Sequence, residues 1–193
     1  MSIFKSCNSF AANQYIVLDT KKMITRTILA FLALPAIVAG MIPWFLARIP
    51  APGIFQSGYG GLVMLIGGDI LLASVVSFYR RGKGTLAPWD PPRHLVAQDL
   101  YGFNRNPMYV GVVIIVLGWS VITGNPWNYG YALAVPVMLH LRVVHYEEKE
   151  MQRLFGREWE LYKNSVPRWG FRRRLYSTEV RQSAVGDASK PRA

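Results

Sequence analysis

The sequence predicts an all-α polytopic membrane protein with about four transmembrane helices and a C-terminal cytoplasmic amphipathic helix. Hydrophobic residues make up 51% of the 193 residues and charged residues only 17%, which is too apolar for a disordered or nucleic-acid-binding tail protein. The apolar residues gather into long blocks. The formal net charge of +11 lies in the basic connections between them, which suits an anionic bilayer surface better than nucleic acid.

Four apolar blocks are the candidate membrane spans. Residues 24–46 and 59–79 meet the roughly 20 residues that a helix needs to cross the hydrocarbon core. Residues 108–123 and 127–144 are shorter, so tilt, local thinning or neighbouring helices must make up the difference. Gly124-Asn125-Pro126 separates these two blocks and is typical of a turn, so we expect them to form a tight helical hairpin.

Lys and Arg are distributed unevenly around these blocks. Four lie before residue 27, one in the first connection, five between residues 80 and 106, none in the hairpin turn and twelve from residue 142 onward. By the positive-inside rule this alternation predicts a multi-pass protein with its N- and C-termini in the cytoplasm. A soluble bundle of buried helices is the alternative, but it would not need the alternation.

The two ends of the chain differ from the middle. Residues 1–23 are a polar extension without the uninterrupted apolar stretch of a cleavable signal, and Met23 is an alternative start. Residues 177–193 are small, polar and free of aromatic residues, so we expect a disordered tail. Residues 24–176 then form one membrane domain. The lone Cys7 excludes an internal disulfide framework and a Cys-based zinc cluster.

The second block carries two features of its own. Gly60, Gly67 and Ser74 recur every seven residues, with two further glycines beside them, which predicts a small-residue seam for close helix contact. Asp69 lies near mid-span and is costly there unless it is paired, hydrated or protonated. Both a site role and a buried interhelical hydrogen bond remain open for it.

Polar and aromatic residues crowd the cytoplasmic entrance of the third block. Pro107 suits the first turn of a helix, and the free N–H groups of such a helix start can hold an anionic ligand group. Candidate ligand contacts in this segment are Tyr101, Arg105, Asn106, Pro107, Tyr109 and Gly111. Interfacial tyrosines are also common membrane anchors, so that interpretation stays open for Tyr101 and Tyr109.

A helix over residues 145–165 is expected to follow the fourth block without a break. Met151, Phe155, Trp159, Tyr162 and Val166 share one apolar stripe at helical spacing. Glu148 starts that stripe, and a carboxylate on a buried side needs a cation or hydrogen-bond donors. Glu147 and Glu148 are therefore site candidates, whereas Glu150, Glu158 and Glu160 fit a solvated face.

Two other kinds of site receive less support. His145 and Glu148 form an i, i+3 pair of the kind found in metal sites, but with three His and no HxxxH or HExxH cluster we expect no metal. His145 is instead expected to be an interfacial residue or a ligand contact. Gly82-x-Gly84-x-x-Ala87 mimics a dinucleotide loop, but it follows a membrane span rather than a strand.

Three segments in order resemble a known family. GTLAPWDPPRHLV, LYGFNRNPMYVG and HYEEKEMQRLFGREWELYKNSVPRW are similar to the integral-membrane isoprenylcysteine carboxyl methyltransferases and phospholipid methyltransferases, over about residues 82–169. The resemblance implies an all-α membrane fold. Its last helical hairpin and flanking cytoplasmic segments would enclose S-adenosylmethionine, with an opening towards lipid for the methyl acceptor.

The resemblance also implies roles for individual residues. Residues 105–111 match the family's Arg-His-Pro-x-Tyr-x-Gly segment, with Asn106 in place of the usual His, and an amide cannot carry charge or shuttle a proton. Glu147 and Glu148 match the family's acid pair, and Arg142 matches a basic residue before it. The expected cofactor-binding residues are Tyr101, Arg105, Asn106, Pro107, Tyr109, Gly111, His145, Glu147 and Glu148, and the expected catalytic residues are Arg142 and Glu148.

The implied function is S-adenosylmethionine-dependent methylation of a lipid-like or prenylated acceptor that enters from the bilayer. The arginines favour an anionic acceptor methylated on its carboxylate, which needs no general base, and Arg142 or Arg105 would position it. An amine acceptor, as in a phospholipid ethanolamine N-methyltransferase, would need Glu148, Asp69 or His145 as base. A non-catalytic membrane assembly or transport protein of the same fold is the second alternative.

Overall fold

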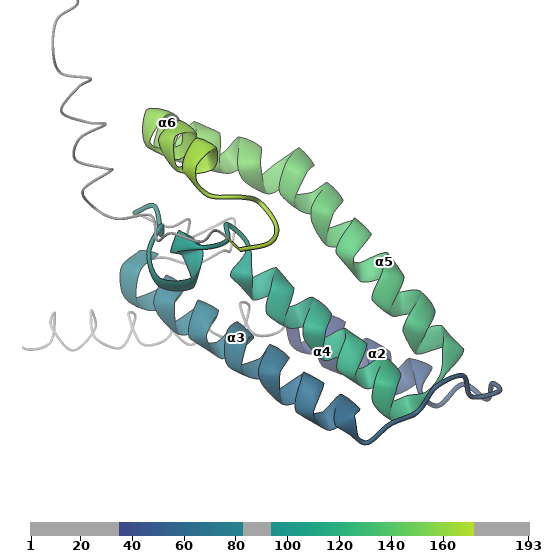
Figure 1. The fold of residues 1–193 in the computed structure, drawn as a ribbon. Coiled ribbons are helices and arrows are strands. Elements are labelled where there is room, and N and C mark those ends of the chain that lie inside the picture. The colour runs from purple at the N-terminus through teal and green to yellow at the C-terminus, as the bar shows by residue number, and fades with distance from the viewer. Residues whose placement is uncertain (1–34, 83–93, 172–193) are drawn as a thin grey trace, which may run out of the picture.

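The computed structural model describes residues 35–82 and 94–171, and all regular structure in these two ranges is helical. A π-helical turn, Ile37–Met41, leads into α2 (Ile42–Leu46). The longer helices are α3 (Tyr59–Gly82), α4 (Pro107–Thr123), α5 (Pro126–Arg142) and α6 (Glu148–Ser165). In Figure 1, α3 and α4 run side by side, α5 leans away from them, and α6 lies beyond the end of α5.

The all-α prediction is confirmed for the described residues, and α3, α4 and α5 begin and end within three residues of the predicted second, third and fourth blocks. By length and composition, α3 is the one described helix that could cross a membrane. Ile37–Leu46 and Pro107–Thr123 are apolar but shorter. The predicted polar extension, residues 1–23, and the predicted tail, residues 177–193, lie outside the described residues.

The predicted small-residue seam joins α3 to α4. A Cβ on Gly60 would lie 2.6 Å from the carbonyl oxygen of Gly118, and one on Gly67 would lie 2.9 Å from that of Gly111. Gly68, next to the seam, would meet nothing within 4 Å. Because the paired glycines run in opposite directions along the two helices, α3 and α4 are antiparallel, and Gly111, near the start of α4, lies beside Gly67 and Leu71 in the middle of α3.

The predicted hairpin turn between α4 and α5 is also present. Gly124 ends α4 in the left-handed region, at φ 63°, which suits a residue without a Cβ. The Asn125 side chain accepts from the backbone N–H of Trp127 and so caps α5. Its amide donates to the carbonyl oxygens of Leu46 and Ile49, at 3.2 and 2.9 Å, which ties the turn to the end of α2.

The passage from α5 to α6 is less regular than the sequence suggests. A π-helical turn, Val143–Glu147, separates the two helices. A kink follows at Gly156, where φ is 49° and ψ is −116°, a conformation that a side chain disfavours. The expectation of an unbroken helix over residues 145–165 is therefore wrong. Gly156 interrupts the helix, although the apolar stripe keeps its helical spacing across this residue.

The stripe still packs together despite the kink. Trp159, Tyr162 and Val166 form a buried cluster with Ala97 from the segment before α4. Met151 and Phe155, on the other side of the kink, pack against the same cluster. The second half of α6 thus folds back over the segment that leads into α4, and a hollow is left beneath it.

Candidate functional site

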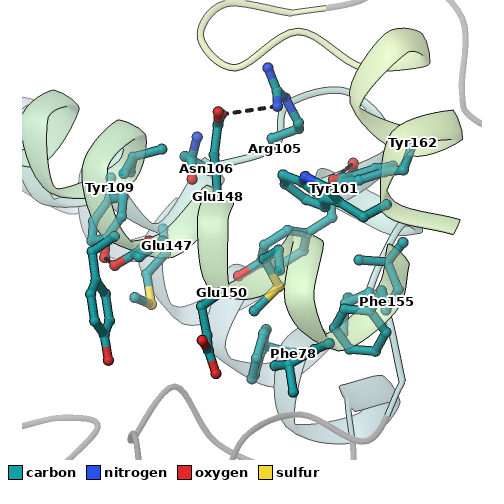
Figure 2. Close-up of a pocket in the computed structure, with 18 of the residues that line it drawn as sticks. Phe78, Tyr101, Arg105, Asn106, Tyr109, Glu147, Glu148, Glu150, Phe155 and Tyr162 are labelled. Atoms are coloured by element: carbon teal, nitrogen blue, oxygen red, sulfur yellow. Dashed lines mark hydrogen bonds and ion pairs between the residues drawn. The ribbon is translucent and has the colours of Figure 1, made fainter. Parts of the chain in front are cut away.

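A pocket lies between the end of α3, the segment before α4, the π turn Val143–Glu147 and α6 (Figure 2). The pocket and the open solvent at its mouth together make up about 1110 Å³ of empty space. One part of its wall is apolar and aromatic and includes Phe78, Val96, Tyr101, Met108, Met151, Phe155 and Trp159. The other part is polar and includes Arg105, Asn106, Tyr109, Arg142, Glu147, Glu148 and Glu150.

The π turn explains how Arg142 and Glu147 come to face each other. Residues five apart point in different directions on an α-helix, whose turn holds 3.6 residues. A π turn is wider, with hydrogen bonds from i to i+5, and so brings such residues closer to the same side. The Arg142 Nε lies 2.8 Å from Glu147 Oε1, and the Tyr109 hydroxyl donates to the same oxygen. No described residue bonds to the other oxygen, Oε2, so it can accept from a ligand.

Glu148 is held quite differently from its neighbour. Its Oε1 accepts from Arg105 Nη1 at 3.0 Å and from Arg168 Nε at 2.6 Å, and its Oε2 accepts from Arg168 Nη2 at 2.8 Å. The side chain of Glu148 is only 14% exposed and that of Arg105 only 9%. The expectation that Glu148 meets a cation is therefore confirmed, and both of its oxygens are occupied. Figure 2 shows the Arg105 contact.

Residues 166–169, here called the return segment, lead from α6 back to the start of α4. The backbone N–H of Arg105 donates to the Pro167 carbonyl at 3.0 Å, and the Asn106 amide donates to the Arg168 carbonyl at 3.1 Å. The indole N–H of Trp169 donates to His140 Nδ1 on α5 at 2.9 Å. The return segment thus joins α4, α5 and α6 on one side of the pocket.

Aromatic residues surround the buried part of Arg105. Its guanidinium carbon lies 5.7 Å from the centre of the Trp159 ring, within reach of a cation–π interaction. Burial lowers the pKa of the Arg105 guanidinium, and the Glu148 carboxylate opposes that shift. The Tyr162 hydroxyl donates to the Tyr101 carbonyl at 2.7 Å. Burial also raises the pKa of Tyr101, so its phenol stays neutral and contributes uncharged aromatic surface to the pocket.

Residues 94–106, here called the wall segment, precede α4 and are held by contacts of Asp99, here called the latch. Asp99 adopts a left-handed backbone conformation, φ 54°, which is uncommon for a residue with a side chain. Its carboxylate accepts from Arg81, at 2.8 and 2.9 Å, and from the Ser77 hydroxyl at 2.8 Å. The Arg81 hydrogen bonds, followed by that from Ser77, hold the pKa of Asp99 below its usual value. These contacts anchor the wall segment to the end of α3.

Not every predicted site residue lines the pocket. Pro107 is buried in the first turn of α4, and Gly111 lies in the seam, where a Cβ would come within 2.8 Å of the α3 backbone. His145 is exposed, and its Nδ1 lies 2.9 Å from the Leu141 carbonyl oxygen. The pocket does bring together Tyr101, Arg105, Asn106, Tyr109, Arg142, Glu147 and Glu148.

Asp69 is exposed on α3 and does not line this pocket. It makes no hydrogen bond with any residue in the described ranges. Of the two alternatives left open for Asp69, the buried interhelical hydrogen bond is not found among the described residues, because the seam turns the opposite face of α3 towards α4. Within residues 35–82 and 94–171, no group of three His, Cys, Asp or Glu is placed to hold a metal ion.

Arg168 and part of the apolar wall, including Phe78 and Met108, were not singled out from the sequence. Arg168 stands in the SVPRW end of the third resembling segment, but nothing in its spacing indicates that the chain turns back towards Glu148. Phe78 and Met108 belong to apolar blocks in which every position resembles its neighbours. Long-range packing selects them for the pocket: Phe78 packs with Val96 and Tyr101, and Met108 belongs to the core between α4 and α5.

Comparison with known proteins identifies the family. Residues 57–158, just over half of the chain, match the profile of phospholipid methyltransferases. The chain belongs to the phospholipid methyltransferase family. The matched region contains α3, α4, α5 and the acid pair, and it ends before Trp159 and the return segment. The part of the pocket that these later residues close is therefore outside the family match.

Curated relatives are named for one branch of such enzymes. Protein-S-isoprenylcysteine O-methyltransferase B of Arabidopsis thaliana is 32% identical over 110 residues, 55% of each chain. Protein-S-isoprenylcysteine O-methyltransferase A of the same plant is 28% identical over 137 residues, 68% of this chain and 69% of that protein. The chain spans about half the length of the first of these relatives. No solved structure gives a significant match.

Proposed function

We propose that this member of the phospholipid methyltransferase family is an S-adenosylmethionine-dependent membrane methyltransferase that methylates the carboxylate of a prenylated, lipid-like acceptor. One observation carries the proposal: a single pocket joins the Arg105–Tyr109 segment to the acid pair, with charged groups at one side and aromatic surface at the other. The names of the relatives, protein-S-isoprenylcysteine O-methyltransferases, support the choice of acceptor.

The chemistry of the lining residues fits the cofactor. When bound, S-adenosylmethionine would supply a methyl group on a positively charged sulfur. Oε2 of Glu147, to which no residue in the described ranges bonds, can accept hydrogen bonds from an ammonium or hydroxyl group. Tyr101 and Trp159 offer flat aromatic surface to a nucleobase or a cation. Arg105 brings positive charge close to that surface, as a ligand carboxylate requires.

Arg142 is the residue best placed to orient an anionic acceptor. It lines the pocket, and its side chain remains 41% exposed even though it is paired with Glu147. A carboxylate is already ionised at neutral pH, so its oxygen can attack without a general base. The chain then has only to hold the acceptor in line and exclude water. The apolar wall around Phe78 and Met151 suits the acceptor's hydrocarbon tail.

Methylation of a phospholipid amine is the second candidate, and one observation favours it. Glu147 lines the pocket, and its Oε2, without a partner among the described residues, could attract an ethanolamine ammonium group or remove its proton. Glu148 is poorly suited to that task because Arg105 and Arg168 occupy both of its oxygens. A non-catalytic role is not favoured, since one pocket combines the Arg105–Tyr109 segment with the acid pair, Glu147 and Glu148.

The proposed topology places four spans in the bilayer, with both termini and the pocket on the cytoplasmic side. Labelling by an impermeant thiol reagent tests it in a Cys7→Ser background. Gln56→Cys, in the connection between α2 and α3, should be labelled in intact cells. Arg153→Cys, on α6, should be labelled only after permeabilisation. The reverse pattern would contradict the orientation, and labelling of both in intact cells would contradict the membrane arrangement.

A labelled-methyl assay tests the activity and separates the two acceptors. Purified protein in detergent receives S-adenosylmethionine with a radioactive methyl group and either N-acetyl-farnesylcysteine or phosphatidylethanolamine. We expect a base-labile methyl ester on the farnesylcysteine analogue. Transfer to phosphatidylethanolamine alone would favour the amine acceptor. No transfer to either compound, with no binding of S-adenosylhomocysteine, would contradict the proposed function.

A further inference from the structure

Arg168 holds the site together without lining it. It is absent from the pocket wall, yet it makes two of the three hydrogen bonds that Glu148 accepts. The two bonds form a fork, the geometry in which an arginine recognises a carboxylate most specifically. The orientation of Glu148 is therefore set mainly by Arg168, and the remaining bond determines where Arg105 lies.

The Arg105 side chain depends on this arrangement. Its Nη1 donates to Glu148, while its Nε is buried and has no partner among the described residues. A buried donor without a partner is costly. If Arg168 were removed, the Glu148 carboxylate could turn, leave Nη1 and form its fork with Arg105 through Nε and Nη2 instead. That exchange would satisfy Nε and draw the guanidinium out of its present position in the pocket wall.

The return segment also fixes the backbone on which Arg105 is carried. The Pro167 carbonyl accepts from the backbone N–H of Arg105, and the Arg168 carbonyl accepts from the side chain of Asn106. Arg168 thus acts through its side chain on Glu148 and through its carbonyl on Asn106. Two pocket residues from the start of α4 and one from the start of α6 depend on it.

We propose that Arg168 is a positioning residue for the methyl transfer: its fork to Glu148 keeps the Arg105 guanidinium presented to the ligand. The assignment of that ligand as S-adenosylmethionine rests on the proposed function. Asn106 then serves as an anchor for the return segment. An amide is sufficient for that role, which requires a hydrogen-bond donor and no proton transfer.

A double-mutant cycle tests whether Arg168 acts through Glu148. The dissociation constant for S-adenosylhomocysteine is measured by calorimetry for Arg168→Gln, Glu148→Gln and the double variant. We expect Arg168→Gln to weaken binding about tenfold, the scale of one lost charge-assisted contact. The double variant should bind no more weakly than Glu148→Gln alone, because without the carboxylate there is nothing to capture Arg105. Arg168→Lys should fall between the wild type and Arg168→Gln.

Arg153→Gln is the matched control. Arg153 forms a similar fork with Glu150 on the same helix, but its side chain is 74% exposed, so its loss should leave binding unchanged. If the double variant weakened binding by the product of the two single effects, Arg168 and Glu148 would act independently, and the proposal would be overturned. Unchanged binding by Arg168→Gln with a lowered melting temperature would also overturn it, since Arg168 would then be only structural.

A second measurement keeps this proposal separate from the identity of the cofactor. Amide hydrogen exchange of residues 104–109, with no ligand added, should be faster in Arg168→Gln than in the wild type or Arg153→Gln. Suppose that exchange is faster in Arg168→Gln but the wild type does not bind S-adenosylhomocysteine. The positioning role would then be retained, and S-adenosylmethionine would be rejected as the ligand. Unchanged exchange in Arg168→Gln would overturn the positioning role itself.

Discussion

The two sides of α4 differ in their packing: one is in close contact with α3, and the other borders a pocket. Towards α3, Gly111 and Gly118 meet Gly67 and Gly60 with the backbones almost in contact, so no space is left for a ligand. Towards the π turn and α6, the same helix starts at a pocket whose polar wall includes two arginines, Arg105 and Arg142, and the acid pair. The contrast indicates that the α3–α4 seam is the rigid reference against which the pocket residues are placed.

Breaking the seam should have the largest effect. A Cβ on Gly67 would lie 2.8 Å from the backbone nitrogen of Ile115 and 2.9 Å from the Gly111 carbonyl oxygen, so Gly67→Ala forces the two helices apart. We expect a loss of about 3 kcal/mol in stability, measured by thermal unfolding in detergent. Gly68→Ala is the control, because its Cβ meets nothing within 4 Å. Equal losses in the two variants would contradict the seam.

Removing the charge of Glu147 should affect the pocket and spare the seam. Glu147→Gln weakens the contacts with Arg142 and Tyr109 and removes the negative oxygen available to a ligand. We expect kcat/KM for methyl transfer to fall about 50-fold, or roughly 2 kcal/mol, with the melting temperature nearly unchanged. A matching loss of stability would show that Glu147 serves the fold instead.

Arg142→Ala should separate acceptor binding from cofactor binding. Because Arg142 is partly exposed at the pocket and the cofactor contacts are attributed to other residues, we expect KM for the acceptor to rise about tenfold, or roughly 1.4 kcal/mol. The dissociation constant for S-adenosylhomocysteine should change less. Equal losses for acceptor and cofactor would remove Arg142 from acceptor recognition.

The latch at Asp99 should give the smallest effect. Its pKa is lowered by Arg81, so its contribution to stability is full above the unfolded-state value near 4 and is lost as the pH falls through the lower folded-state value. The pair is about half exposed, so Asp99→Asn should cost less than about 1 kcal/mol at pH 7. Unfolding at pH 7 and pH 3 measures this, and a cost that does not shrink at pH 3 would contradict the ionic latch.

The two sides of α4 also differ in how far the sequence predicts them. The seam could be predicted because Gly60 and Gly67 recur at a period that one helix face repeats, so a local pattern determines the contact. The hairpin turn at Gly124 was equally local. The role of Asp69 stayed open from the sequence, because the residue type alone does not show whether a mid-span carboxylate has a partner.

The pocket was predictable in its residues but not in its connections. Arg105, Tyr109, Glu147 and Glu148 stand out by type and by their resemblance to a family. Arg168, in contrast, reaches Glu148 only because the chain kinks at Gly156 and folds back. Neither that kink nor the π turn has a periodic signal. Their effects depend on long-range packing, which a local pattern does not contain.

Under the proposed function, the α5–α6 side of α4 binds S-adenosylmethionine while the seam does not. Amide hydrogen exchange with and without saturating S-adenosylhomocysteine tests it most directly. We expect added protection in residues 101–110 and 142–155, and none in residues 60–74 of α3. Protection confined to α3, or no change anywhere at millimolar ligand, would contradict the account.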